Sequence, residues 1–117
     1  MKAEDIIEGL NLHIEIKRRD NKIDARGHLV MQKEIKVNPT FKAYKEYRYT
    51  IWFVKNRKSY RVLTIQQTAR VLDDYEDVIH KQLNTMLCQS IFNWIGSYSY
   101  NKVIKGEYDG TPEDRNE

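Results

Sequence analysis

The chain has 117 residues, of which 40% are hydrophobic and 32% charged, and its formal net charge is +3. This length predicts one domain, because a chain of this size buries about two thirds of the surface that it exposes when unfolded. No apolar run approaches the roughly 18 to 20 residues of a membrane-spanning helix, and acids follow Lys2 at once, unlike in a secretory signal. The lone Cys88 excludes an internal disulfide. We therefore expect a soluble cytoplasmic protein with no membrane contact.

Basic and acidic side chains are unevenly distributed. Four acids cluster at 73–77 and five lie in the segment 105–117. Between residues 41 and 61, Glu46 is the only acid, against the basic residues Lys42, Lys45, Arg48, Lys55, Arg57, Lys58 and Arg61. A basic centre of this kind permits an anionic partner without requiring one.

Two hydrophobic periods follow each other at the N-terminus. Residues 3–10 (AEDIIEGL) predict a short helix that ends at Gly9. Residues 10–17 (LNLHIEIK) alternate apolar and polar side chains, which predicts a first strand. After a turn at 18–22, residues 28–37 predict a second strand that ends before Pro39, since proline cannot donate to a sheet ladder.

Residues 42–54 and 59–65 predict a third and a fourth strand, joined by a tight turn around Asn56 and Arg57. A two-residue or a four-residue loop gives a register in which paired residue numbers sum to 113, whereas a three-residue loop shifts it. The predicted pairs on the core face are Tyr49 with Thr64, Ile51 with Val62, and Phe53 with Tyr60. On the other face, they are Arg48 with Ile65 and Trp52 with Arg61.

A long C-terminal helix is predicted between Asp73, a suitable N-cap, and Gly96, a suitable end. Its apolar face comprises Tyr75, Val78, Ile79, Leu83, Met86, Leu87, Ile91, Trp94 and Ile95. We therefore predict an α+β domain over residues 1–104, in which an antiparallel sheet of about four strands packs under this helix and a short N-terminal helix lies at one edge. Residues 105–117 are predicted to form a flexible acidic tail.

The basic hairpin gives the main functional indication. If odd-numbered residues of the third strand face the core, its even face exposes Tyr44, Arg48 and Trp52. Proteins that bind single-stranded nucleic acids stack bases on exposed rings and contact phosphates with Lys and Arg. We therefore predict a non-enzymatic module that contacts nucleic acid through Tyr44, Arg48, Trp52, Lys55, Arg57, Lys58 and Arg61.

The same residues also fit a structural role or a protein interface. Aromatic residues are favoured in strands for packing alone, and Arg61 beside Trp52 would form a cation–π pair. Aromatic and arginine side chains are also enriched at protein hot spots. Phe92 lies off the apolar stripe of the long helix. Together with Trp94 and the SYSY segment, it would form the interface of a symmetric homodimer. A protein-binding or inhibitory module is therefore the alternative.

Few residues of the chain have the spacing of a metal, cofactor or catalytic site. The three histidines and Cys88 lack the spacing of a helical metal pair, and no glycine-rich phosphate loop occurs, so we expect no metal and no cofactor. One pattern consists of the E-x-K triplet of Glu34 and Lys36, with acids upstream at Asp20 or Asp24 and at Glu4 or Glu8. It resembles the D…ExK pattern of the PD-(D/E)xK nucleases. That resemblance implies a third option, a nuclease in which carboxylates hold Mg²⁺ and the lysine supports the attacking water.

Overall fold

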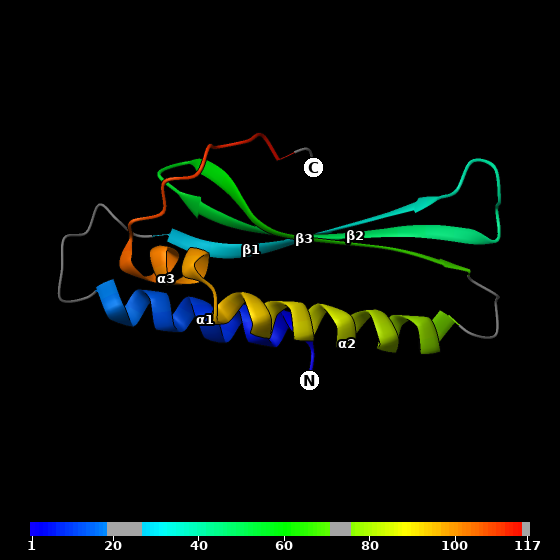
Figure 1. Cartoon of the computed structure of the whole chain (residues 1–117), viewed down its shortest axis with the longest axis horizontal. Coiled ribbons are helices and arrows are strands. Elements are labelled where there is room, and N and C mark those ends of the chain that lie inside the picture. The colour runs from blue at the N-terminus through cyan, green and yellow to red at the C-terminus, as the bar shows by residue number, and fades with distance from the viewer. Residues whose placement is uncertain (19–26, 71–75, 116–117) are drawn as a thin grey trace.

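The structure is a computed structural model that describes residues 1–18, 27–70 and 76–115. Its elements are α1 (Ala3–Arg18), β1 (Gly27–Val37), β2 (Tyr44–Lys55), β3 (Lys58–Arg70), α2 (Glu76–Ile95) and α3 (Tyr98–Lys105). The strands form one antiparallel sheet in the order β1-β2-β3, and the helices lie on one face of it (Figure 1). The molecule is elongated, with extents of 51 × 28 × 20 Å. No helix in the described ranges is long and apolar enough to cross a membrane.

The N-terminal segment is one helix, so the prediction of a strand at residues 10–17 is wrong. α1 continues through Gly9 to Arg18, and it buries Ile7 and Ile14 while Leu12 is exposed. Helical spacing groups Ile7 with Ile14, whereas strand alternation would group Leu12 with Ile14. Asn11 also takes the place of a fourth strand, because its side chain donates to the Leu29 carbonyl at 3.0 Å and accepts from the Leu29 N–H at 2.6 Å.

The β2–β3 hairpin has a two-residue turn, in which Asn56 and Arg57 adopt φ values of 52° and 64°. Such left-handed pairs form the turns that match the twist of a hairpin. The predicted pairing of Trp52 with Arg61, next to the turn, is confirmed. A bulge at Val62 then shifts the register by one residue. The predicted partners of Tyr49, Ile51 and Arg48 are therefore wrong, and the observed pairs are Tyr49 with Ile65, Ile51 with Leu63, and Arg48 with Gln66.

The core lies between the sheet and the helices. The odd-numbered residues Tyr49, Ile51 and Phe53 are buried there, which confirms the predicted core face of the hairpin. Burial, followed by the nearby Tyr47 and Glu4, raises the pKa of Tyr49 above its ordinary value of 10.0. The helices contribute Ala3, Ile7, Ile14, Leu83, Leu87, Ile91, Trp94, Tyr100, Val103 and Ile104 to the same cluster.

Two helices follow the sheet, where the sequence predicted one. α2 confirms the long helix and its end before Gly96, while the predicted cap Asp73 lies outside the described residues. α3 was not predicted, although both of its ends carry recognisable signals. Ser97 Oγ accepts from the Tyr100 N–H at 3.2 Å, and Gly106 ends the helix with a left-handed φ of 76°.

The segment 107–115, which falls within the predicted flexible tail, runs from α3 past β3 toward the sheet face opposite the helices (Figure 1). The Glu113 N–H donates to the Ser59 carbonyl at 2.8 Å. The Tyr108 ring packs edge-on against Phe53 and Tyr60, with centroids 6.2 and 5.6 Å apart. These contacts place an acidic segment next to the basic hairpin.

Candidate binding surfaces

Trp52 lies on the sheet face opposite the helices, but its side chain is only 3% exposed. Its indole N–H donates to Gln32 Oε1 on β1 at 2.7 Å. The guanidinium carbon of Arg61, on β3, lies 5.5 Å from the ring centroid. Groups from both flanking strands thus contact the ring. The prediction that Trp52 is exposed is therefore wrong. A base cannot stack on a ring with so little accessible surface, so Trp52 is not available as a stacking platform.

The two arginines of the predicted platform have acidic partners within the chain. Arg61 Nη2 lies 3.3 Å from Glu113 Oε1, and Arg48 Nη1 lies 3.7 Å from Glu34 Oε2. With its amide turned to satisfy both groups, Gln66 also accepts from Arg48 Nε at 2.9 Å and from Nη2 at 3.1 Å. Two of these partners have no local signal in the sequence, because the bulge brings Gln66 opposite Arg48 and Glu113 lies far along the chain from Arg61.

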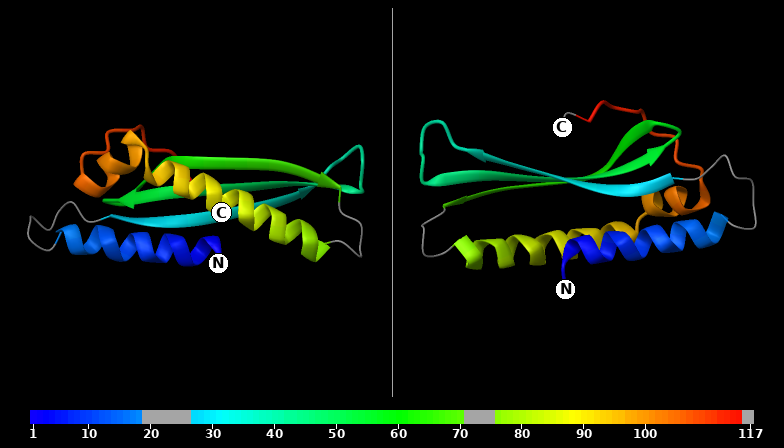
Figure 2. Two further views of the ribbon diagram at one scale, coloured as in Figure 1. Left: turned by 60° about the horizontal axis from the view of Figure 1, so that its bottom comes forward. Right: turned by 180° about the vertical axis from the view of Figure 1, so that it is seen from behind.

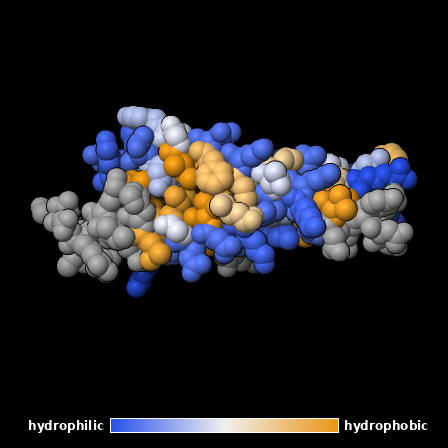
Figure 3. Space-filling model, turned by 90° about the horizontal axis from the view of Figure 1, so that it is seen from below, coloured by the Kyte–Doolittle hydropathy of each residue, from blue (hydrophilic) through white to orange (hydrophobic). Residues whose placement is uncertain are grey.

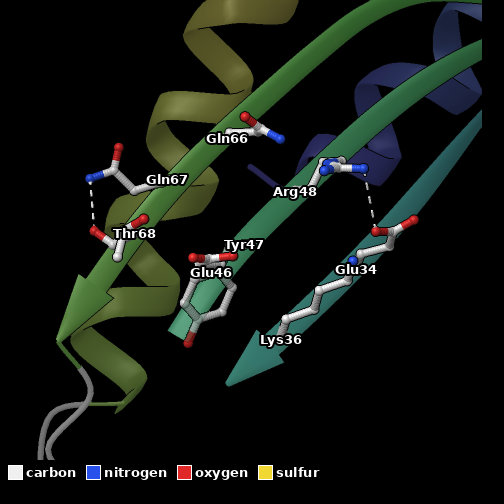
Figure 4. A pocket seen from close by; sticks show the side chains of 8 residues that line it. All are labelled: Glu34, Lys36, Glu46, Tyr47, Arg48, Gln66, Gln67 and Thr68. Carbon is white, nitrogen blue, oxygen red and sulfur yellow. Dashed lines mark hydrogen bonds and ion pairs between the residues drawn. The ribbon is translucent and has the colours of Figure 1, made fainter. Parts of the chain in front are cut away.

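A hollow of about 230 Å³ lies on this face beside Arg48. Figure 4 shows its lining side chains, which are Glu34, Lys36, Glu46, Tyr47, Arg48, Gln66, Gln67 and Thr68. Six of them form two rows across the strands, one of Lys36, Glu46 and Thr68 and the other of Glu34, Arg48 and Gln66, and the pair of Tyr47 and Gln67 lies between these rows. Each row pairs one cation with one carboxylate, so the lining gives no preference for an anionic ligand.

The remaining predicted residues lie at opposite ends of the hairpin. Tyr44 begins β2, and its ring contacts Phe41 edge-on with centroids 6.2 Å apart. Lys55 ends β2, and its Nζ donates to the Gly106 carbonyl at 3.4 Å. Arg57 and Lys58 are exposed at the turn. The structure therefore brings Trp52 and Arg61 together but does not join the seven predicted residues into one continuous surface.

The nuclease-like pattern is only partly described by the structure. Glu34 and Lys36 occupy the same sheet face, as that chemistry requires. Glu4 and Glu8 lie on α1, which packs against the other face, and the segment with Asp20 and Asp24 is outside the described residues. Over the described ranges, no three His, Cys, Asp or Glu side chains are grouped to hold a metal ion.

The helix side of the molecule carries exposed apolar side chains, which gather over its middle in Figure 3. Asn84 of α2 joins the N-terminus of α1 to α2, because it accepts from the Ala3 N–H at 3.1 Å and donates to the Met1 carbonyl at 2.8 Å. Cys88 Sγ lies 3.9 Å from the same carbonyl, and Phe92, one turn further along α2, is 51% exposed. Met1, Cys88 and Phe92 are called the Phe92 surface below.

Trp94 does not join this surface, although the sequence analysis placed it in a homodimer interface with Phe92. It is only 6% exposed, and its ring packs edge-on against Tyr100 with centroids 5.0 Å apart. Since Trp52 is buried too, neither tryptophan is available to report a partner by becoming shielded from water. Tyr98, in the SYSY segment, is exposed, and Lys102 Nζ lies 5.1 Å from its ring centroid.

Comparisons of the chain with protein-family models, curated proteins and solved structures found no match. Functional inference therefore rests on the surfaces described above.

Proposed function

We propose that this chain is a non-enzymatic binding module that contacts another protein through the Phe92 surface. The observation that carries this proposal is the half-exposed side chain of Phe92, one helical turn from Cys88, whose Sγ lies 3.9 Å from the Met1 carbonyl. Burying apolar surface stabilises a complex by about 25 cal/mol per Å², and buried aromatic rings are frequent anchors of protein interfaces. A protein partner with an apolar pocket would therefore gain from covering Phe92.

The opposite side of the molecule supports this choice by contrast. Its one tryptophan is buried, and Arg48 and Arg61 are each paired with a carboxylate. An anionic ligand would have to compete with these carboxylates for the two guanidinium groups. The helix side involves no such competition at Phe92, because the half-exposed side chain is apolar and carries no charge.

The matched substitutions Phe92→Ser and Val78→Ser test this function. Both residues lie on α2 and are exposed to a similar extent, at 51% and 49%, but Val78 lies near the opposite end of the helix. Proteins captured from the native cell extract by the wild-type chain are identified by quantitative mass spectrometry, and the affinity of each is then measured with purified partner. We expect Phe92→Ser to weaken binding at least tenfold, equivalent to about 1.4 kcal/mol, and Val78→Ser to leave it unchanged.

The control for folding is the melting temperature, which both serine variants should retain because both side chains are half exposed. Equal binding by the wild-type chain and by Phe92→Ser would rule out the Phe92 surface as the site of contact.

Nucleic-acid binding is the second candidate, and the exposed cations of the hairpin turn favour it. Arg57 in the two-residue turn and Lys58 at the start of β3 are exposed at an end of the sheet. They retain the phosphate-contacting role predicted from the sequence, while the stacking role of Trp52 is dropped. Fewer cations on the surface mean a weaker contact with a phosphate backbone, and one whose affinity falls less steeply with salt.

Fluorescence anisotropy with single-stranded and double-stranded oligonucleotides at low salt tests this second candidate. Binding that is lost in the Arg57→Glu, Lys58→Glu double variant and retained in Lys42→Glu, beyond the other end of β2, would support it. The affinity should also fall as salt is added, through counterion release. If neither oligonucleotide binds at low salt, the hairpin turn is not a nucleic-acid site.

A further inference from the structure

The outer edge of β1 carries backbone groups that point away from the sheet. Asn11 bonds both the N–H and the carbonyl of Leu29, so the groups of this odd-numbered residue face outward. The Asn38 N–H donates to the Tyr44 carbonyl, so an even-numbered residue faces β2. Backbone direction alternates along an antiparallel strand. The residues that face outward beyond Leu29 are therefore Met31, Lys33, Ile35 and Val37.

This part of the edge is not covered by α1. Figures 1 and 2 show that α1 begins near the middle of the sheet and runs beside the half of β1 that starts at Gly27. Ile35 and Val37, in the other half, are 45% and 57% exposed. Within the described ranges, no hydrogen bond from another element reaches the outward groups of these two residues. An exposed strand edge with apolar side chains is a template for pairing with another strand.

We propose that a second copy of this chain pairs antiparallel with this edge, with Ile35 opposite Ile35 of the second copy. The two three-stranded sheets then become one continuous sheet. Ile35 and Val37, which the monomer leaves in water, become covered on the helix side of the joined sheet. This surface is separate from the Phe92 surface, so the inference does not depend on the proposed function.

Charge complementarity selects this register. With Ile35 on the two-fold axis, Glu34 faces Lys36 of the second copy, and Lys36 faces its Glu34. Oppositely charged residues directly across a strand pair stabilise it, and like charges destabilise it. Centring the pair on Lys33, Glu34 or Lys36 would instead place two identical charges on the axis.

Centring the pair on Val37 would bring Ile35 opposite Pro39, which has no N–H to donate. In the Ile35 register Pro39 falls opposite Met31, four residues from the axis and beyond the end of β1. Among the symmetric registers from Lys33 to Val37, the Ile35 register is the one that sets opposite charges directly across the pair and places no like charges on the axis.

The two lysines on this edge, Lys33 and Lys36, favour one register of the strand pair over the others. Lysine on an edge strand commonly discourages association with other strands. Here Lys33 Nζ lies 5.9 Å from the centroid of the Tyr49 ring of its own chain, and Lys36 faces a carboxylate of the second copy only in the Ile35 register. The two lysines thus disfavour the other registers while they admit this one.

Cysteine cross-linking tests the register directly. In a Cys88→Ser background, Ile35→Cys places two thiols on the axis, with Cα atoms about 5.5 Å apart, within the range of about 4.4–6.8 Å that a disulfide spans. We expect a covalent dimer on a non-reducing gel after mild oxidation. Val37→Cys is the control, because its side chain is more exposed yet lies two residues from the axis and should not cross-link to itself.

A mixture of the Val37→Cys and Lys33→Cys chains should cross-link, since these positions face each other in the Ile35 register. Ile35→Cys that cross-links no faster than Val37→Cys would overturn the register.

Sedimentation equilibrium over a concentration series tests the association itself. We expect the wild-type mass to approach twice that of the chain, Lys36→Glu to raise the dimer dissociation constant at least tenfold, and the Glu34→Lys, Lys36→Glu double variant to recover part of that loss. Lys36 is exposed and Glu34 is partly exposed, and circular dichroism checks that the variants fold. A wild-type chain that stays monomeric throughout the series would overturn the proposal, as would a dimer that Lys36→Glu leaves unchanged.

Discussion

Trp52 occupies a position in the central strand where side chains from all three strands meet. Gln32 of β1 accepts its indole hydrogen bond, and Arg61 of β3 lies beside its ring. Glu113 in turn holds Arg61, so the C-terminal segment contributes to this arrangement. An aromatic ring on the side of the sheet away from the helices is thus used for stability, which leaves it unavailable for stacking on a base.

At the residue scale, we predict that Trp52→Ala lowers the free energy of unfolding by about 3–5 kcal/mol, as is typical for the truncation of a buried aromatic side chain. Trp52→Phe should cost less, because it keeps most of the apolar volume and removes chiefly the donor to Gln32. Urea unfolding followed by circular dichroism measures both values. An unchanged midpoint for Trp52→Ala would show that the ring contributes little to the fold.

The N-terminal segment shows, at the element scale, how packing chooses between two periodicities. A strand over residues 10–17 would bury Leu12, whereas the helix buries Ile14 together with Ile7 and exposes Leu12. The helix also places Asn11 against the edge of β1, where its amide meets the N–H and carbonyl of Leu29. A side chain that satisfies both backbone groups protects this part of the edge from further pairing.

Gly9→Ala distinguishes the two conformations of this segment. A methyl group at Gly9 would meet no other atom within 4 Å, and alanine is favoured over glycine inside a helix by about 0.5–1 kcal/mol. We therefore expect Gly9→Ala to raise the free energy of unfolding by that amount, as measured by chemical denaturation. A loss of stability would instead indicate that Gly9 ends a short helix in a left-handed conformation, as the sequence first suggested.

In the molecule as a whole, several tyrosines with raised pKa values make the free energy of unfolding depend on pH in the alkaline range. Burial raises the pKa of Tyr49, Tyr100 and Tyr108 above 10.0, and for Tyr108 the neighbouring Asp109 and Glu113 raise it further. The hydrogen bond and charge of Asp109 likewise raise the pKa of Lys102 above 10.5. The folded state therefore retains these protons to a higher pH than the unfolded chain does.

The sign of the resulting pH dependence follows from linkage. A group whose pKa is higher in the folded state contributes stability that is complete below its unfolded pKa and is lost as the pH rises past that value. We expect the free energy of unfolding to decline above pH 10.0, the ordinary tyrosine value, and the decline to be shallower in Tyr49→Phe and Tyr108→Phe. Urea unfolding at several alkaline pH values measures these slopes, and equal slopes in all three proteins would contradict the assignment.

Much of the hairpin and of α2 was predictable from local patterns. The alternation of Tyr49, Ile51 and Phe53 set the core face of β2, and Asn56 suited a left-handed turn. The candidate binding residues were predicted less well, because their availability depends on contacts between distant segments. Glu113 and the bulge at Val62 decide what Arg61 and Arg48 contact, and neither has a local signal in the sequence.

The α+β class, the position of the hairpin turn and the long helix follow from local patterns, because turn dihedrals, side-chain alternation and helical periodicity act over a few neighbouring residues. The helical conformation of residues 10–17, the burial of Trp52 and the open half of the β1 edge within the described residues emerge only from packing. Each of these depends on which distant surface lies alongside. A local period can fit a helix or a strand, and the packing partner selects between them.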